Sequence, residues 1–392
     1  MAAEERPYEP PATTRAISNA TIGAVGFLCR SFLYALSRTE VHGLDRVQAL
    51  LDERADPERR ERGLITVSNH VSVLDDPIVW GVLPFRYHWN ANNSRWSLGS
   101  HDICFKKGQS ILTEFFTYGN TLPMHRIAHS KYGGIFQPTM TQVIRLLSDP
   151  HTASPQIQKL NDVEDARPSS LPPTDPFSSS ELTYTTNGED SFPAPSFYPS
   201  RRHSWIHVFP EGKIHQHPDK IMRYFKWGVA RMILEAEPCP DVICMWIDGP
   251  QQIMDNERTF PRPLPRPGKD VSITFGEKMN VEKVFEPFRE RWRALKAKSE
   301  RKRLALDAGA LSKDWNGELG EVRDQELRYG AEAVQLRIDV TLAVREEVLK
   351  IRRSTGLPDE DPKSSLAETW REEGSKDKAE GKMRDESVVK DM

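Results

Sequence analysis

The sequence contains the stretch Gly63-Leu64-Ile65-Thr66-Val67-Ser68-Asn69-His70-Val71-Ser72-Val73-Leu74-Asp75-Asp76-Pro77. It opens with a short run rich in β-branched side chains, which is typical of a buried strand. The chain then turns polar at Asn69 and His70. A helix is expected to begin shortly afterwards, either at the capping-box pattern of Ser72 and Asp75 or at Asp76-Pro77. The stretch therefore predicts a strand, a tight polar turn and a helix.

Similar signals recur along the chain. Short apolar runs predict further strands at residues 205–209, 241–247 and 271–275, and amphipathic patterns predict helices at 136–147 and 219–235. Strands that alternate with helices favour an α/β fold with functional residues at the ends of strands. We therefore expect an α/β sheet flanked by helices.

Composition divides the 392 residues into one catalytic domain with several additions. Apolar residues make up only 38% of the sequence, and the deficit lies in segments rich in Pro, Ser and charged residues, which are typical of disorder. The expected parts are a disordered N-terminus (1–15), a catalytic domain with a membrane-associating N-terminal helix (16–148 and 204–281), a disordered insertion (149–203), a helical C-terminal extension (282–355) and a disordered charged tail (356–392). In the extension, a packing face is expected from Leu327, Ala331, Val334, Ile338, Leu342 and Leu349.

The charge balance and the cysteines exclude several classes of protein. The formal net charge is only −3, so nucleic-acid binding is not expected. The four cysteines have neither zinc spacing nor the density of a disulfide-rich domain, and we expect free thiols at Cys29, Cys104, Cys239 and Cys244. Residues 1–15 carry acidic side chains and prolines, unlike a cleavable transit peptide, and contain no visible secretory signal.

Residues 17–36 form the most apolar stretch of the chain, but Asn19 and Arg30 interrupt it. A bilayer span is therefore not firmly supported. An interfacial or half-inserted helix, with Arg30 reaching the lipid phosphates, agrees with both the apolar character and the charge. A first helix that packs on the domain remains the alternative.

His70 and Asp75 are the candidate catalytic pair. Across one tight turn, Asp75 can accept the Nδ1 proton of His70 and orient the ring, which leaves Nε2 free as a base. Such a pair can deprotonate a substrate hydroxyl that attacks an ester, without a protein nucleophile. The spacing alone is weak evidence, and the alternative is a structural histidine bound to a capping aspartate.

Two further clusters lie at the predicted ends of strands. Phe209-Pro210-Glu211-Gly212-Lys213 presents a carboxylate and an ammonium on a glycine turn, and Gly119-x3-Pro123-x2-Arg126 presents a guanidinium. Arginine suits bidentate phosphate contact, and turn amides can bind anionic oxygens. Each cluster alone is more often an ordinary turn with solvated charges.

Together and in this order, the three clusters resemble the sequence blocks of the glycerolipid acyltransferase superfamily. The similarity covers roughly residues 17–279 without the insertion. The finer resemblance, to the tafazzin family, rests on Asp75-Asp76-Pro77, Trp80-Gly81, Asp102-Ile103-Cys104-Phe105, Trp205 to Lys213, and Arg223-Tyr224-Phe225-Lys226-Trp227-Gly228. Lys213 stands where many acyl-CoA-using relatives have Thr-Arg-Ser.

The resemblance implies a glycerolipid-acyltransferase-like fold and a CoA-independent phospholipid–lysophospholipid transacylase. His70 would be the base and Asp75 its orienter. The implied donor and acceptor are a phospholipid and a lysophospholipid, with cardiolipin and monolysocardiolipin as typical partners. The substrate-binding residues would be Asn69, Ser72, Arg126, Glu211, Gly212 and Lys213. Amides near Gly212 and at the helix start after His70 are the candidate oxyanion donors.

The resemblance implies no cofactor, and no metal is expected. The histidines at 203, 207, 215 and 217 lack the partners of a metal site. It also implies mitochondrial membranes, on surfaces that face the intermembrane space, with self-association or association with membrane complexes. The stretch 219–236 is a basic amphipathic pattern that suits either a membrane interface or packing on the sheet. Rival functions are a CoA-dependent lysophospholipid acyltransferase, a phospholipase and a non-enzymatic membrane scaffold.

Overall fold

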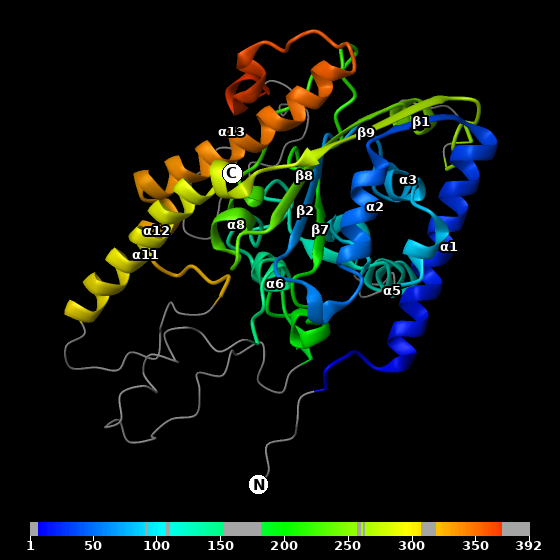
Figure 1. Ribbon diagram of the computed structural model, residues 1–392. Helices are drawn as coiled ribbons and strands as arrows, with labels where there is room; N and C mark the ends of the chain where they lie inside the picture. The colour runs from blue at the N-terminus through cyan, green and yellow to red at the C-terminus, as the bar shows by residue number, and fades with distance from the viewer. Residues whose placement is uncertain are drawn as a thin grey trace.

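A computed structural model describes residues 7–90, 93–106, 110–151, 182–256, 260–261, 263–306 and 319–370. Its centre is a seven-stranded sheet in the order β1-β9-β8-β2-β7-β3-β4 (Figure 1). Only β8 and β9 pair antiparallel within this sheet; its other neighbouring strands are parallel. The strands are β1 (Arg38–His42), β2 (Leu64–Ser68), β3 (Trp96–Ser100), β4 (Thr121–Met124), β7 (Trp205–Val208), β8 (Asp241–Asp248) and β9 (Asp270–Lys278).

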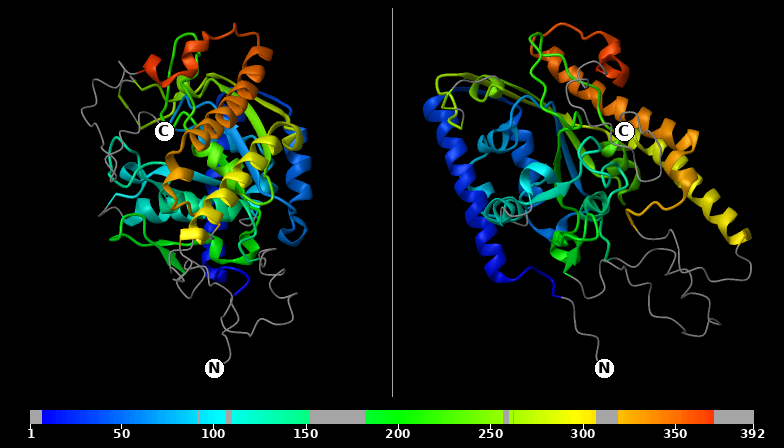
Figure 2. Two further views of the ribbon diagram at one scale, coloured as in Figure 1. Left: turned by 90° about the vertical axis from the view of Figure 1, so that its left-hand side faces the viewer. Right: turned by 180° about the vertical axis from the view of Figure 1, so that it is seen from behind.

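Helices cover both faces of the sheet. Helices α1 (Ala12–Leu36), α2 (Leu44–Glu53) and α3 (Asp75–Gly81) form one layer, whereas α6 (Pro138–Leu147), α8 (Gly228–Glu235), α11 (Glu286–Leu306) and α13 (Ala331–Ser354) form the other. Figures 1 and 2 show α1 and α13 on opposite sides of the sheet. The shorter helices are α4 (His101–Cys104), α5 (Ser110–Tyr118), α9 (Pro250–Ile253), α10 (Val281–Val284) and α12 (Gln325–Tyr329), with 3₁₀ turns η1 (Pro57–Arg59), η2 (Phe85–His88), η4 (Pro195–Phe197), η5 (Pro199–Arg201) and η6 (Pro362–Ser365). The α/β architecture predicted from the sequence is therefore confirmed.

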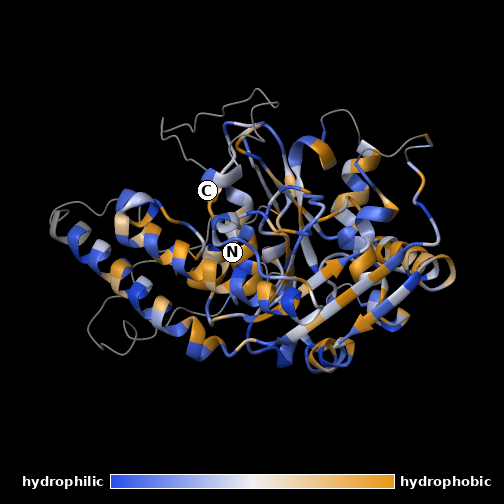
Figure 3. Ribbon diagram, turned by 90° about the horizontal axis from the view of Figure 1, so that it is seen from above, coloured by the Kyte–Doolittle hydropathy of each residue, from blue (hydrophilic) through white to orange (hydrophobic). Residues whose placement is uncertain are grey.

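The central strands show why the sequence forms a parallel sheet. Every residue of β2 and β7 is buried, and so is β8 apart from its last residue. Strands that are covered on both faces consist of nearly continuous apolar runs rather than an alternating pattern. The helices are instead banded orange and blue in the hydropathy view (Figure 3), as expected when one side packs on the sheet. All four cysteines are free, as predicted.

Helix α1 packs on the domain through close backbone approach. Among the described residues it is the one helix long and apolar enough to cross a bilayer, yet it contacts α3, η2 and α5. Arg30 does not reach outward: its guanidinium donates to the carbonyls of Val82 (2.7 Å) and Leu83 (3.1 Å), just after α3. Arg30 therefore ties α1 to the end of α3, which agrees with the alternative of a first helix packed on the domain, and its contact with lipid phosphates stays a prediction. The outer face of α1 still exposes apolar side chains such as Phe27 and Leu28.

All three segments that were expected to be disordered contain ordered structure within the described residues. Within the predicted insertion, residues 182–203 contain β5 (Thr183–Tyr184), β6 (Phe192–Pro193), η4 and η5, and Tyr184 and Phe192 pack in a small core with Phe105. Residues 356–370 of the predicted tail likewise fold back on the domain, where Glu360 binds Arg345, and α1 begins at Ala12, inside the predicted disordered N-terminus. The other parts of those predictions, at 1–6, 152–181 and 371–392, lie outside the described residues.

The helix predicted at residues 219–235 is wrong in its first half. Helix α8 begins only at Gly228, and residues 220–226 lack regular structure because arginines of α13 bind their backbone carbonyls. Arg223 and Arg231 are buried, so this segment is not a basic surface helix.

The packing face of α13 also differs from the predicted stripe. The buried side chains include Leu336, Val340, Val344 and Val348, whereas Leu342 is 43% exposed. The prediction counted only apolar residues, but buried arginines occupy the same face of the helix.

Replacing Gly81 by alanine should loosen the docking of α1. A Cβ atom at Gly81 would lie 2.8 Å from Cβ of Cys29 and 3.1 Å from its carbonyl carbon. Overpacking of this kind costs about 1–3 kcal/mol, so urea unfolding should show a loss of that size. Gly228→Ala is the matched control, because a Cβ there meets nothing within 4 Å. Equal stability of the two variants would contradict the observed packing of α1.

Candidate active site

The carboxyl ends of β2 and β7 bring two predicted motifs together. These strands are parallel, with Val67 opposite Val208, so the chain leaves both at the same edge of the sheet. His70 follows β2, and the turn at residues 209–213 follows β7. The rings of His70 and Phe209 stack with centroids 4.3 Å apart. The two motifs therefore form one site, at the edge where ligands bind in α/β sheets.

The His70–Asp75 pair has the geometry of an oriented base. Nδ1 of His70 lies 2.8 Å from Oδ2 of Asp75, which is fully buried. The His70 side chain remains 20% exposed, and no group among the described residues hydrogen-bonds its Nε2. Asp75 thereby holds the tautomer in which Nδ1 carries the proton and Nε2 carries the lone pair.

Asp75 is held by the backbone of the same turn. Its Oδ2 also accepts the N–H groups of Val71 (2.6 Å) and Ser72 (2.8 Å). Burial raises the pKa of Asp75 above its ordinary value, and the hydrogen bonds from His70 and the backbone limit that rise. Asp75 also lies in the first turn of α3, where a negative charge is favoured. The turn and the helix start therefore fix the carboxylate before any substrate is present.

Glu211 is a buried support for the backbone of His70. Its Oε1 accepts the N–H of His70 (2.8 Å), and its Oε2 accepts the N–H of Arg223 (2.9 Å). Burial raises the pKa of Glu211 to about 8, although these N–H groups and Arg345 favour the charged form. Both oxygens thus hold protein backbone, whereas the resemblance implied a role in binding substrate.

Asn69 and Ser72 also have structural partners. Asn69 is 1% exposed, and its amide pairs with both the carbonyl and the N–H of Ile247 at 2.8 Å, which ties the end of β2 to β8. The Ser72 side chain is fully buried, and its hydroxyl accepts the N–H of Leu74. Half of the predicted capping box is present, because Asp75 accepts the Ser72 N–H.

The cationic groups lie closer to solvent. Arg126 follows β4, and its Nε donates to Asp102 Oδ1 at 3.0 Å, while the Arg126 side chain remains 30% exposed. Burial acts to raise the pKa of Asp102, but its hydrogen bonds with Arg126 outweigh that effect and hold it below the ordinary value. Gly212 has a φ of +60°, which suits glycine, and Lys213 is exposed beside it. Arg126 and Lys213 thus place positive charge at the carboxyl edge of the sheet.

Several candidate oxyanion donors are already used within the protein. The N–H groups of Val71 and Ser72 bind Asp75, and the N–H of Gly212 closes the turn onto the carbonyl of Phe209 at 2.9 Å. The predicted donor role of these amides is therefore not supported by this geometry.

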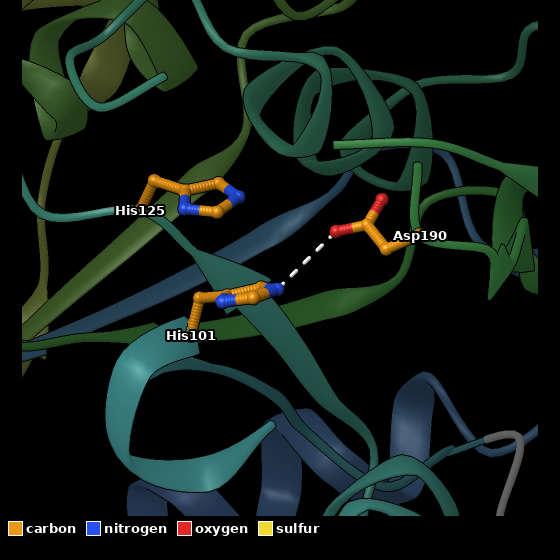
Figure 4. A group of neighbouring side chains, drawn as sticks. All are labelled: His101, His125 and Asp190. Atoms are coloured by element: carbon orange, nitrogen blue, oxygen red, sulfur yellow. Dashed lines mark hydrogen bonds and ion pairs between the residues drawn. The ribbon is translucent and has the colours of Figure 1, made fainter. Parts of the chain in front are cut away.

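One histidine and aspartate cluster was not predicted from the sequence. His101, His125 and Asp190 converge after β3, β4 and β5, and their potential ligand atoms lie within 4.8 Å of one another (Figure 4). Among the described residues this is the group that could hold a metal ion. The structure instead joins the three by hydrogen bonds: Asp190 to His101 Nε2 at 3.2 Å, and Thr186 between Asp190 and His125 Nε2. The cluster therefore anchors residues 183–190 on the sheet edge.

Among the described residues, the histidines at 203, 207, 215 and 217 form no group of three with a common ligand position, although the rings of His215 and His217 lie 5.7 Å apart. His207 is buried under the site, with Nδ1 2.9 Å from the Thr66 hydroxyl, and burial lowers its pKa to about 3. His203 Nδ1 instead bonds the Arg60 carbonyl.

A partly buried ion pair at the start of α3 was also missed. Arg95 binds Asp76 through two hydrogen bonds of 2.8 and 2.5 Å, which ties α3 to the start of β3. The doubled aspartate at 75–76 was noticed in the sequence, but the partner of Asp76 could not be found there because Arg95 lies 19 positions away.

The fold and the site define an α/β protein with an oriented imidazole at the carboxyl edge of its sheet. The chain is 32% identical to the tafazzin of Saccharomyces cerevisiae, over 86% of this chain and 78% of that protein. It is 27% identical to an N-acylphosphatidylethanolamine synthase of Arabidopsis thaliana, over 66% of this chain and 69% of that protein. A solved structure, the 1-acyl-sn-glycerophosphate acyltransferase PlsC of Thermotoga maritima, aligns with a TM-score of 0.35 and 15% identity over 74% of this chain and 80% of that chain. No family model matches the sequence.

The chain belongs to the tafazzin family, and it is an acyltransferase.

Glu211→Gln should change how stability depends on pH. The pKa of Glu211 is about 8 in the folded protein and 4.5 ordinarily, so the folded state binds this proton more tightly. The stabilisation from this group is complete below about pH 4.5 and is lost as the pH rises through about 8. The stability of the wild type relative to Glu211→Gln should therefore fall between pH 5 and pH 8.5.

Urea unfolding at intervals of pH tests this prediction. Glutamine retains one carbonyl acceptor but does not titrate, so other ionisable groups cancel in the difference between the two proteins. Parallel stability curves would show that Glu211 is charged throughout this range.

Proposed function

We propose that this acyltransferase is a CoA-independent phospholipid–lysophospholipid transacylase that remodels the acyl chains of cardiolipin, with monolysocardiolipin as acceptor. The observation that carries the proposal is the His70–Asp75 pair, in which Nδ1 is bound to a buried carboxylate at 2.8 Å and the ring retains an exposed edge. Membership of the tafazzin family supports the choice of reaction.

In the proposed mechanism, His70 Nε2 takes the proton of the acceptor hydroxyl. The resulting alkoxide attacks the ester carbonyl of the donor phospholipid and forms a tetrahedral intermediate. The intermediate collapses by breaking the donor's ester bond, and the imidazolium returns the proton to the departing lysophospholipid oxygen. Asp75 stabilises the imidazolium between these two proton transfers. No protein nucleophile and no cofactor is required.

The energetics are consistent with a reaction that lacks coenzyme A. One carboxylic ester is formed and a similar one is broken, so the exchange is nearly balanced in free energy and needs no thioester. The catalytic need is then a positioned base, which typically accelerates a reaction by about 10²–10⁴-fold.

Arg126 and Lys213 are the groups that we assign to lipid phosphates. Both lie at the carboxyl edge that carries His70, and both retain exposure to solvent. Arg126 is bound to Asp102, which fixes the direction of its guanidinium and leaves donors for a phosphate oxygen.

We assign membrane contact to the outer surface of α1 and α5. Its exposed apolar side chains are Ile17, Phe27, Leu28, Ile111, Leu112 and Phe115. Exposed apolar side chains on two helices that contact each other suit insertion into a bilayer interface. The C-terminal end of α1 leads into Arg38, opposite Asp270, at the edge where β8 and β2 also end. Lipid that reaches the C-terminal end of α1 would therefore lie at the same edge of the sheet as His70.

The family also points to mitochondrial membranes, on surfaces that face the intermembrane space, and to self-association or association with membrane complexes. These assignments rest on the family alone.

His70→Ala should abolish acyl transfer that proceeds without coenzyme A. The experiment mixes purified protein with a labelled phospholipid donor and a lysophospholipid acceptor, and measures label in the acceptor. The rate should fall by about 10²–10⁴-fold, and Asp75→Asn should cause a loss of similar order by releasing the ring. His42→Ala, an exposed histidine at the end of β1, is the control and should retain the wild-type rate.

The rival functions give different outcomes in the same assay. Transfer by the wild type only after acyl-CoA is added would select the CoA-dependent acyltransferase. Release of free fatty acid while acceptor is present would select a phospholipase. Full activity of a folded His70→Ala protein would exclude His70 as the base.

Charge on the apolar surface should weaken membrane binding. Leu28 is 65% exposed and Ile111 is 83% exposed, so Leu28→Glu with Ile111→Glu should not disturb the core. The double variant should lose most of its co-flotation with cardiolipin-containing vesicles, since a charge in the interface is costly. Leu342→Glu, on α13 at the opposite side of the sheet, is the control. Undiminished vesicle binding by the double variant would show that the membrane contact lies on another surface of the protein.

A further inference from the structure

The C-terminal segment, residues 331–370, contains a buried group of charges that lies outside the motifs of the active site. Glu360 is 2% exposed; its Oε2 binds Nη2 of Arg345 at 2.6 Å, and its Oε1 lies 3.3 Å from Nε of Arg352. Both arginines belong to α13 and are 4% or less exposed. Replacing such a group by apolar residues is often neutral or stabilising, so stability alone is a weak reason for its presence.

This group binds the backbone of residues 219–223. Glu360 accepts the N–H of Met222 at 2.8 Å. Arg345 donates to the carbonyls of Met222 (3.1 Å) and Arg223 (3.2 Å). Arg352 donates to the carbonyls of residues 219 (3.1 Å) and 220 (3.0 Å). Residues 219–223, which lack regular secondary structure, are thus held in one conformation by side chains of the C-terminal segment.

The held segment in turn supports the catalytic turn. The N–H of Arg223 binds Glu211, and the other oxygen of Glu211 binds the N–H of His70. The carbonyl of His70 is held as well, because it accepts the N–H of His215 at 2.8 Å. The His215 ring packs edge-on against Trp370 of the same C-terminal segment, with centroids 4.8 Å apart. Both backbone groups of His70 are therefore fixed through parts of the chain that the C-terminal segment contacts.

We propose that Glu360 is a positioning residue for the acyl-transfer reaction, which holds residues 219–223 with Arg345 and Arg352 so that Glu211 keeps His70 in place. This inference rests on the proposed function for its catalytic consequence. A displacement of about 1 Å at a catalytic group can lower a rate about 10²-fold, so a contact this remote can control the reaction.

The charge of Glu360 also affects the pKa of Glu211. Burial is the main cause that raises the pKa of Glu211, while the charge of Glu360 raises it further and that of Arg345 lowers it. Removing the charge of Glu360 also leaves the charge of Arg345 less compensated. Both changes lower the pKa of Glu211, so a pH-dependent step that involves Glu211 should shift toward lower pH.

The experiment compares Glu360→Gln with Asp359→Asn in the full-length protein. Asp359 is the neighbouring residue, is 77% exposed, and pairs only with Arg353 among the contacts of the described residues. Glu360→Gln should lower kcat for CoA-free transfer by about 10- to 100-fold with a smaller change in KM, and should shift the pH profile of kcat toward lower pH. Asp359→Asn should leave both unchanged. In a Glu211→Gln background, Glu360→Gln should cause no further shift of the profile.

Hydrogen exchange tests the same inference without relying on activity. Arg345→Lys keeps the charge near Glu360 but removes the guanidinium that binds two carbonyls, and it serves if Glu360→Gln fails to fold. Either variant should speed amide exchange at residues 209–223 and at His70, whereas Asp359→Asn should not.

The two failures are distinguishable. Absence of CoA-free transfer in the wild type would sink the proposed function, and unchanged exchange and an unchanged pH profile in Glu360→Gln would sink the positioning role. An equal loss of kcat in Asp359→Asn would also overturn it, because the effect would then belong to the tail in general.

Discussion

The hydrogen bonds of one buried carboxylate connect the parts of this site. Glu211 accepts the N–H of His70, which precedes it by 141 positions, and the N–H of Arg223. The first bond ties the turn after β2 to the turn after β7, and the second ties both turns to the segment before α8. Parallel pairing of β2 with β7 brings the turns to one edge, but it does not orient the backbone of His70. That orientation depends on a carboxylate whose burial is costly, and the surrounding N–H groups offset part of this cost.

The sequence predicted those features of the fold that are encoded locally. The strands at residues 64–68 and 241–248 are mostly apolar runs, and His70 and Asp75 interact across a single turn, so neither required knowledge of distant contacts. The helix expected from residue 219 failed for the opposite reason. Its apolar periodicity was real, but side chains more than 120 positions away bind its backbone carbonyls and hold it in an irregular path. Local propensity is a weak guide where tertiary contacts compete for the same backbone groups.

Predictions of disorder from composition failed where polar and charged residues form buried contacts. Residues 182–203 are rich in Pro, Ser and Thr, yet Asp190 joins His101 directly and His125 through Thr186, and the aromatic rings at 184 and 192 are buried. The C-terminal extension similarly contains many arginines, which usually indicate a solvated surface. Buried guanidinium groups in this extension donate to carbonyls at the ends of loops and helices, where water would otherwise serve. A charge count cannot tell these two uses of arginine apart.

The site residues that were assigned by resemblance divide in a similar way. His70 and Asp75 meet as the motif implied, whereas Asn69, Ser72 and Glu211 bind backbone inside the protein. A motif records which residues accompany a reaction, but it does not separate those that touch substrate from those that hold the catalytic group. The observed contacts make that separation: of the eight assigned positions, Asn69, Ser72 and Glu211 bind backbone around the turn that carries His70.

These constraints are consistent with a base that acts on lipids held by a membrane. In the proposed transacylation, exchange between similar esters would provide almost no driving force, and no reactive thioester would compensate for a poorly placed base. The rate of that reaction would then depend on how well His70 is held while two large substrates approach its exposed edge. A rigid turn, supported through Glu211 from the sheet and from the C-terminal extension, meets that need without enclosing the substrates. If the exposed apolar side chains of α1 and α5 contact the membrane as proposed, the bilayer would hold the acyl chains, and the protein would need to preorganise little more than the base and the charges near it.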